Sequence, residues 1–247
     1  MRTLAADLDG TIYKGNILLP KVKETYLHLK IIGINIIFIS NNSSQTPEEI
    51  KTKLEALLQV EIALENIITP LRVIQNVEEL INSKIFIFGS KSLKKYVEQY
   101  NDNFTSIHEA ETVLIGRKDN FDLEEIEIIA RSIVNGARAF CLNKDLTFPT
   151  EEGEKPGNGA VVKILEDLSK SKIESLGKPD KLFIDYLIKN KFSVDWVIGD
   201  RVDTDILLAK NLKVDSILVK TGVTNFMDIN NAKYIINEFD EIIKIIT

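Results

Sequence analysis

The stretch Asp7-Leu8-Asp9-Gly10-Thr11 decides the fold, because its two carboxylates, glycine and hydroxyl follow directly on the short apolar run Thr3-Leu4-Ala5-Ala6. The apolar run predicts a buried strand. In an open parallel α/β sheet, ligands bind at the carboxyl ends of strands, so two acids at this point favour chemistry over stability. Alternation along an extended chain predicts that Asp7 and Asp9 point to the same side, and Gly10 permits a sharp exit. An ordinary Asp-Gly turn is the structural alternative.

The composition predicts a globular protein that binds neither nucleic acid nor a membrane. The chain has 247 residues, 44% of them hydrophobic, enough for one large domain or two smaller ones. Its net charge of -6 argues against nucleic acid or an anionic membrane as main partner. One cysteine and two histidines exclude a disulfide framework and a His/Cys zinc site, so any metal must be held by oxygen. Without a leader or an apolar stretch of about 18 residues, a cytoplasmic protein is expected.

Strand-like and helix-like segments alternate at both ends of the chain, in the βαβα rhythm of a parallel sheet. The expected elements near the N-terminus are a strand at 4–8, a helix at 22–32, a strand at 34–39 and a helix at 47–58. Those near the C-terminus are a helix at 181–189, a strand at 195–198, a helix at 205–210 and a strand at 216–219. We expect both stretches to share one sheet. Thr46, Pro47 and Glu49 predict a capping box at the second helix.

The segment between these stretches is long enough for an independent unit of helices and strands, with boundaries near residues 80 and 175. Its expected elements lie at 84–88, 93–100, 112–115, 123–135, 139–142 and 161–168. Gly and Pro clusters predict loops at 150–159 and 177–180, the second marking the return to the first sheet.

Three further segments place polar residues behind a strand or in a loop. Ser40 to Ser44 adjoins a helix N-terminus, where backbone N–H groups and the helix dipole favour an anion such as phosphate. Gly177-Lys178-Pro179-Asp180 presents a lysine that, taken alone, is more often a solvated charge. Gly199 to Asp205 carries three acids behind a strand; a helix cap at Asp203 or Thr204 is the structural alternative.

In this order, the DxDGT segment, the Ser-Asn-Asn strand end, the Gly-Lys-Pro loop and the GDxxxTD segment resemble the four motifs of haloacid dehalogenase (HAD) superfamily phosphatases. The resemblance extends over essentially the whole chain to the NagD-like and p-nitrophenyl-phosphatase-like branch, through ISNNSS, NGARAFCLNKD, FPTEEG, KPGNGA and LGKPD. It implies an α/β fold with a Rossmann-like, doubly wound parallel-sheet core at 1–80 and 176–247. An inserted α/β cap at 81–175 would set substrate specificity.

The resemblance also implies a function and a set of roles. The expected activity is Mg²⁺-dependent hydrolysis of small-metabolite phosphate monoesters, through an aspartyl phosphate on Asp7 with Asp9 as general acid/base. Asp7, Asp200 and the backbone carbonyl of Asp9 are expected to bind the metal. Ser40, Asn41 and Asn42 are expected to bind the phosphoryl group, whose charge Lys178 would neutralise. Asp205 is expected to orient a metal-bound water or Lys178. Oxygen-only, carboxylate-rich ligation fits Mg²⁺ better than zinc.

The expected substrate contacts of the cap follow the strand at 139–142: Asn143, Lys144, Asp145 and Phe148. Here the chain departs from relatives, many of which have Asn-Pro-Asp at 143–145, whereas pyridoxal-phosphate phosphatases have a histidine where Phe148 aligns. A pyridoxal phosphate specialist is therefore not expected. Packing between cap and core is the alternative for Phe148, and a solvated surface charge is the alternative for Lys144.

Other functions remain open at this point. A phosphotransferase could use the same residues with an alcohol acceptor. A phosphoacceptor switch would also place acids, a hydroxyl and a lysine at strand ends, but Asp9 would shorten the life of its phosphoenzyme and it needs no insert. A silent binding protein should have lost a motif residue, and all four motifs are intact. The expected partner is a small phosphorylated metabolite, and the resemblance also allows a homodimer.

Overall fold

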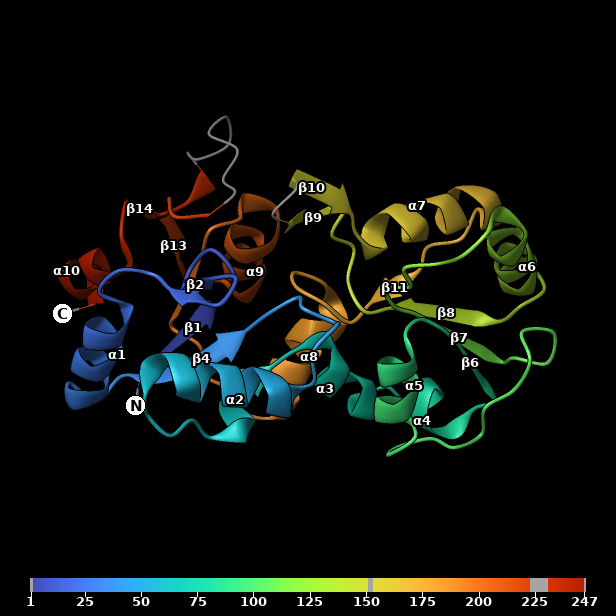
Figure 1. Ribbon diagram of the computed structural model, residues 1–247, viewed down its shortest axis with the longest axis horizontal. Coiled ribbons are helices and arrows are strands. Elements are labelled where there is room, and N and C mark those ends of the chain that lie inside the picture. The colour runs from blue at the N-terminus through green and yellow to red at the C-terminus, as the bar shows by residue number, and fades with distance from the viewer. Residues whose placement is uncertain (1, 151–152, 223–230, 247) are drawn as a thin grey trace. The chain divides into compact units, whose positions relative to one another are not determined.

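The computed structural model describes residues 2–150, 153–222 and 231–246, and it divides into two compact units (Figure 1). The first unit comprises Met1–Ser40, Pro47–Ile68 and Ile184–Thr247, and the second comprises Asn41–Thr46 and Thr69–Phe183. The core and cap boundaries expected near residues 80 and 175 stay a prediction about functional domains, since compactness alone does not define them.

The first unit is built on a six-stranded parallel sheet in the order β14-β13-β12-β1-β4-β5. Its strands are β1 (Thr3–Asp7), β4 (Asn35–Ile39), β5 (Ile67–Ile68), β12 (Trp196–Gly199), β13 (Asp215–Val219) and β14 (Tyr234–Ile236). The prediction that both ends of the chain share one sheet is confirmed. Because β1 lies between β12 and β4, the segments that follow these three strands leave the sheet at the same edge.

Helices cover this sheet with their apolar stripes. They are α1 (Val22–Ile31), α2 (Pro47–Leu58), α8 (Lys181–Lys189), α9 (Leu207–Leu212) and α10 (Ile243–Ile246), with 3₁₀ turns at Leu64–Asn66 and Phe239–Ile242. Leu29 of α1 and Leu54 of α2 are fully buried in one cluster with Leu4 of β1, while α9 packs against β12 and β13. The helix expected at 205–210 is present: a π-helical turn, Val202–Ile206, continues directly into α9.

The second unit has its own parallel sheet, in the order β11-β8-β7-β6. Its strands are β6 (Ile85–Phe88), β7 (Thr112–Ile115), β8 (Arg138–Cys141) and β11 (Glu174–Ser175). Its helices are α3 (Pro70–Val73), α4 (Glu78–Asn82), α5 (Lys91–Val97), α6 (Leu123–Val134) and α7 (Asn158–Ser169), with a 3₁₀ turn at Ile74–Asn76. Buried Ile126 of α6 and Leu165 of α7 share a core with Val113 of β7, so α/β is the fold class of this unit too.

The loop expected at 150–159 is wrong. Strands β9 (Thr147–Thr150) and β10 (Gly153–Pro156) pair there as an antiparallel hairpin, and α7 begins at Asn158. Prolines at 149 and 156 make a strand less expected from the sequence, because proline has no backbone N–H to donate. Both strands of a two-stranded ribbon are edge strands, however, and an edge strand tolerates a missing N–H. A second small hairpin, β2 (Tyr13–Lys14) and β3 (Ile17–Leu18), follows the first motif.

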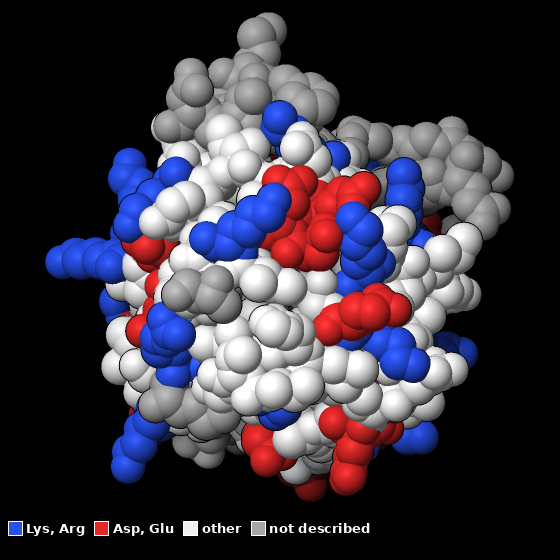
Figure 2. Space-filling model, turned by 90° about the vertical axis from the view of Figure 1, so that its left-hand side faces the viewer, with Lys and Arg blue, Asp and Glu red and all other residues white. Residues whose placement is uncertain are grey.

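The surface carries charges of both signs. The face in Figure 2 shows a group of acidic side chains flanked by basic ones above a largely uncharged centre. Exposed Lys21, at the start of α1, pairs with Glu238 at 2.8 Å and with Asp240 at 3.1 Å. Such pairs contribute little to stability because water screens them. Among the described residues, no helix combines the length and hydropathy needed to cross a membrane.

Candidate active site

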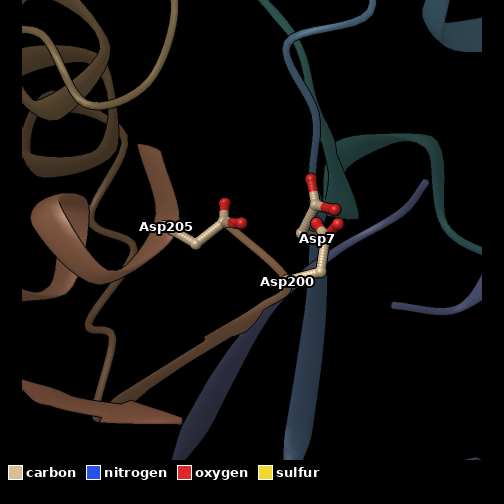
Figure 3. A group of neighbouring side chains, drawn as sticks. All are labelled: Asp7, Asp200 and Asp205. Atoms are coloured by element: carbon tan, nitrogen blue, oxygen red, sulfur yellow. The ribbon is translucent and has the colours of Figure 1, made fainter. Parts of the chain in front are cut away.

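Three carboxylates meet at the edge of the first unit's sheet where β1 ends (Figure 3). Asp7 is the last residue of β1, Asp200 follows β12, and Asp205 lies in the turn at 202–206. One oxygen of each lies within 4.8 Å of the others. They converge because β1 and β12 are adjacent parallel strands. The structure thus brings together Asp7 and Asp200, expected as metal ligands, and adds Asp205 to the group.

Burial makes this cluster costly unless a cation or a proton compensates it. Asp7 is 7% exposed, Asp200 is 1% and Asp205 is 0%. Buried carboxylates repel one another, and proteins keep such groups paired, protonated or bound to metal. Three oxygen donors at this spacing fit a hard divalent cation such as Mg²⁺, which prefers carboxylates and keeps some of its waters. The donor set therefore suits the metal that the motifs imply.

Small residues let the backbone approach the two acids that follow β12. Gly10 has a φ of +89°, and a Cβ there would lie 2.6 Å from Oδ2 of Asp200. A Cβ on Gly222 would overlap the Asp200 carboxylate, and one on Gly199 would overlap that of Asp205. Sequence reasoning noted Gly10 and Gly199 but missed Gly222. The sequence feature that could have indicated Gly222 is its position a few residues after the strand next to β12, which ends at the same edge of the sheet.

Asp205 and Asp203 differ sharply in their surroundings. Oδ2 of buried Asp205 accepts the backbone N–H of Arg201 at 3.1 Å, which orients the carboxylate. The side chain of Asp203 is 69% exposed and pairs with the Arg201 guanidinium at 2.8 Å. The alternative of a helix cap at Asp203 or Thr204 is wrong, because the turn begins directly after Arg201. Asp205 therefore belongs to the site, and Asp203 serves a surface pair.

Asp9 lies outside the buried cluster but close to it. It is exposed, and it forms a backbone bridge with Tyr13, whose carbonyl accepts the N–H of Gly10 at 2.8 Å. The ammonium of Lys53, on α2, lies 3.6 Å from the centre of the Tyr13 ring. Burial, then the charges of Asp9 and Asp7, raise the pKa of the Tyr13 phenol. Burial lowers the pKa of Lys53, and Asp9 opposes this shift. Nothing in the sequence singled out Lys53.

The Ser40 to Ser44 segment leaves β4 and turns into α2. Ser40 is buried, and its N–H donates to the carbonyl of Ile68 at 3.0 Å. Oδ1 of Asn42 accepts the N–H and hydroxyl of Ser44 at 2.9 and 2.8 Å and the N–H of Gln45 at 3.3 Å. Asn42 therefore shapes the turn itself, as asparagines that bond to a following backbone group do.

In the second unit, four of the expected site residues form one hydrogen-bonded group. Nδ2 of Asn41 donates to Oδ1 of Asp145 and to the carbonyl of Lys178, both at 3.0 Å. Oδ1 of Asn41 accepts the N–H of Lys178 at 2.8 Å. Nδ2 of Asn143 donates to the carbonyl of Asn41 at 2.8 Å. The motif lysine and two expected cap residues are thus joined through Asn41.

The other two expected cap residues also have partners in this unit. Lys144 pairs with Glu166 of α7 at 2.8 Å, and although burial lowers the pKa of Lys144, this pairing raises it overall. Lys144 is thus a partly exposed charge paired with Glu166, and its contact with substrate stays a prediction. The ring of Phe148, on β9, stacks 4.0 Å from the guanidinium carbon of Arg117. Arg117 carried no motif signal in the sequence.

Comparison with known proteins identifies the family. A haloacid dehalogenase-like hydrolase model matches residues 4–102, a HAD-hydrolase-like model matches residues 175–242, and together they cover more than half of the chain. The chain is 28% identical to the 5'-nucleotidase YutF of Bacillus subtilis, over 88% of this chain and 86% of that protein. It is 28% identical to an acid sugar phosphatase of Staphylococcus haemolyticus, over 90% and 86%.

Solved structures agree over nearly the full length. A thermostable NPPase double mutant of Geobacillus stearothermophilus is 29% identical, with a TM-score of 0.85 and 98% of each chain covered. NagD of E. coli K-12, at 22% identity, shares the fold with a TM-score of 0.82 and 98% of each chain covered. The four motifs, the parallel sheet and the carboxylate cluster are thus explained together: the chain belongs to the haloacid dehalogenase-like hydrolases, as a NagD-like phosphatase.

Proposed function

We propose that the protein hydrolyses phosphate monoesters of small metabolites in a Mg²⁺-dependent reaction, through an aspartyl phosphate on Asp7. The observation that carries the proposal is the buried cluster of Asp7, Asp200 and Asp205 at the carboxyl end of β1. A phosphate monoester dianion repels nucleophiles, so positive charge must surround the phosphoryl oxygens before a carboxylate attacks in line. Mg²⁺, when bound, supplies part of that charge. Asp7, Asp200 and the backbone carbonyl of Asp9 are its proposed ligands, with Asp205 beside them.

Two carboxylates then divide the chemistry. A carboxylate oxygen of Asp7 attacks phosphorus while the bond to the leaving oxygen breaks, and Asp9 gives that oxygen its proton. In the second step Asp9 takes a proton from the water that attacks the phosphoenzyme, which releases inorganic phosphate and regenerates Asp7. A positioned acid/base group of this kind contributes about 10²- to 10⁴-fold in rate. Exposed Asp9 lies two residues after buried Asp7, and the proton that it takes from water in the second step is the one that it gives to the leaving oxygen in the next turnover.

The remaining motif residues bind the phosphoryl group. Ser40, Asn41 and Asn42 form the proposed phosphate-binding segment, and Lys178 is the proposed cation that neutralises charge between the phosphoryl group and Asp7. For the substrate class, the relatives include a protein named as a 5'-nucleotidase and others named as acid sugar phosphatases. Phosphorylated sugars and nucleotides are therefore the first compounds to screen. A cytoplasmic location and a homodimer stay predictions from the sequence.

Replacement of the nucleophile tests the proposal. Asp7→Asn should reduce phosphatase activity to below a few per cent of wild type, because the amide is nearly isosteric but is neither nucleophilic nor anionic. The variant should keep its circular dichroism spectrum and, in EDTA, melt no lower than wild type, since the change relieves repulsion with Asp200 and Asp205. Turnover of an aryl phosphate with Mg²⁺ is the assay. A folded variant that retains substantial turnover would exclude Asp7 as nucleophile.

A further inference from the structure

The side chain of Asn41 pairs with both main-chain groups of one residue, Lys178. Its Oδ1 accepts the Lys178 N–H at 2.8 Å, and its Nδ2 donates to the Lys178 carbonyl at 3.0 Å. The second hydrogen on Nδ2 goes to Oδ1 of Asp145 at 3.0 Å. Both donor positions of this amide are thus engaged within the second unit. Asn41 would therefore contribute its main chain, rather than its side chain, to the proposed phosphate-binding segment.

The clamp formed by Asn41 on Lys178 is itself held in place. Asn143 donates to the carbonyl of Asn41 at 2.8 Å, and Asn158 donates to the carbonyl of Asn143 at 2.9 Å. Asp145 donates its N–H to Oδ1 of Asn143 at 3.3 Å. These side chains follow β8 or begin α7, so the second unit's sheet and helix fix the position of Asn41.

Burial and close packing show that the arrangement is specific. Asn41 is 9% exposed, Asn143 is 6% and Lys178 is 3%. A Cβ on Gly177 would lie 2.8 Å from Oδ1 of Asn41, so only glycine lets the amide reach the next peptide. Breaking a buried hydrogen bond leaves its partner unsatisfied, which is costly. Two bonds from the Asn41 amide therefore fix the Lys178 backbone, and the third, to Asp145, holds the amide itself.

We infer that Asn41 is a positioning residue for Lys178, and that Asn143 and Asp145 act through this clamp rather than by contact with substrate. The inference rests on the proposed function, in which the Lys178 ammonium lies against the transferring phosphoryl group. A lysine side chain has several rotatable bonds, so its charge is placed accurately only if the backbone that carries it is fixed. Two residues that the sequence suggested as cap contacts are thereby given a different role.

Asn101 offers a matched control for Asn41 in the same unit. It is 6% exposed, its Nδ2 donates to the carbonyls of Leu80 and Ser83, both at 3.0 Å, and its Oδ1 accepts the N–H of Asn103 at 2.8 Å. Asn41→Ala and Asn101→Ala each remove three hydrogen bonds from a buried amide. A loss of stability should be common to both variants, and a loss of Lys178 positioning should appear in Asn41→Ala alone.

Two readouts decide the inference, one of them independent of turnover. Amide hydrogen exchange at Lys178 should accelerate about tenfold or more in Asn41→Ala and stay at the wild-type rate in Asn101→Ala. In assays well below the melting temperature, Asn41→Ala should lower kcat/KM on the order of 10²-fold, whereas Asn101→Ala keeps it. Asp145→Asn, which retains an acceptor oxygen for Asn41, should lose less activity than Asp145→Ala.

A double-mutant cycle separates positioning from general damage. If Asn41 acts through Lys178, Asn41→Ala should have little further effect on kcat/KM in a Lys178→Ala background. Additive losses, equal activity of the Asn41 and Asn101 variants, or unchanged exchange at Lys178 would each overturn the inference. Absence of turnover in the wild-type protein would instead defeat the proposed function, and the exchange experiment would still decide whether the clamp holds Lys178.

Discussion

Two glycines define how closely the backbone encloses Asp200. Gly10 and Gly222 both pack against this carboxylate, and the hydroxyl of Thr221 donates to the carbonyl of Gly10 at 2.5 Å. A methyl group at either glycine would have to displace the carboxylate or the chain. These glycines therefore limit where the Asp200 carboxylate can lie, and the proposed metal site depends on that position.

Gly10 and Gly33 allow this effect to be separated from backbone strain. Both have a positive φ, +89° and +80°, but nothing lies within 4 Å of a Cβ at Gly33. Gly10→Ala and Gly33→Ala should each lose about 1 kcal/mol or more of stability through strain. Only Gly10→Ala should also lose most of its phosphatase activity, measured below the melting temperature of both variants. Equal activity in the two variants would show that the Asp200 contact is unimportant.

Removal of metal should destabilise the folded protein, because binding offsets the repulsion among Asp7, Asp200 and Asp205. A ligand at a hundredfold excess over its Kd stabilises the native state by about 2.7 kcal/mol. For a chain of this size that corresponds to a rise of about 5–10 °C in melting temperature. Thermal melts in EDTA and in millimolar Mg²⁺ measure the shift. Asp200→Ala should abolish the response, and a wild-type melt indifferent to Mg²⁺ would contradict the proposed site.

At the scale of one element, α2 connects the proposed phosphate-binding segment to the chain that returns to the sheet. It begins at Pro47, a few residues after that segment, and it ends at Leu58. Glu55, in its last turn, accepts the N–H of Ile62 at 2.9 Å and pairs with Lys51 at 2.7 Å. One carboxylate thus fixes both the end of the helix and the chain that returns to β5.

The Ile62 N–H and Lys51 together lower the pKa of the Glu55 carboxyl. A carboxyl with a lowered folded-state pKa adds stability above its unfolded pKa, and this stability is lost as pH falls through the folded value. Glu55→Gln should therefore be less stable than wild type in urea at pH 7, and the difference should shrink towards pH 3. Exposed Glu61 supplies the control, since Glu61→Gln should leave the difference near zero at both pH values. A stability difference between wild type and Glu55→Gln that does not change with pH would mean that the charge of Glu55 does not contribute to stability.

For the whole molecule, the two compact units divide the motif residues differently from the chain order. Asp7, Ser40 and Asp200 belong to the first unit, while Asn41 and Lys178 belong to the second. The sequence placed all four motifs outside the insert. Compactness instead groups Asn41 and the motif lysine with the expected cap. The Asn143 side chain donates to the Asn41 carbonyl, and the Asn41 side chain donates to the Asp145 carboxylate.

Residues of the expected cap should govern which leaving group is accepted. Phe148→Ala removes the ring that stacks on Arg117, and Lys144→Ala removes the pair with Glu166. Both should change the ranking of sugar, nucleotide and aryl phosphates while vanadate inhibition stays within about threefold, because vanadate has no leaving group for them to contact. Lys163→Ala, which breaks an exposed pair with Asp167 on α7, should change neither the substrate ranking nor the vanadate inhibition.

Ser40→Ala and Lys178→Ala should instead weaken the binding of all phosphate ligands alike. Cap variants that weaken vanadate equally would contradict this division.

The sequence alone was sufficient for the sheet, for the family and for the identity of the acids. Continuous apolar runs with acids at their ends, and the signals of an amphipathic helix, are local features, so β1, α2 and the Asp7 and Asp200 positions were readable without coordinates. Only the tertiary structure showed that Asp7, Asp200 and Asp205 are buried together, that Lys53 lies over the Tyr13 ring, and that Asn41 clamps the Lys178 backbone. These features depend on atoms far apart in the chain, and their geometry follows from packing between elements rather than from any local pattern. The β9 and β10 hairpin was missed because the prolines favoured a loop locally, whereas the strands are stabilised by pairing with each other, which a local pattern does not show.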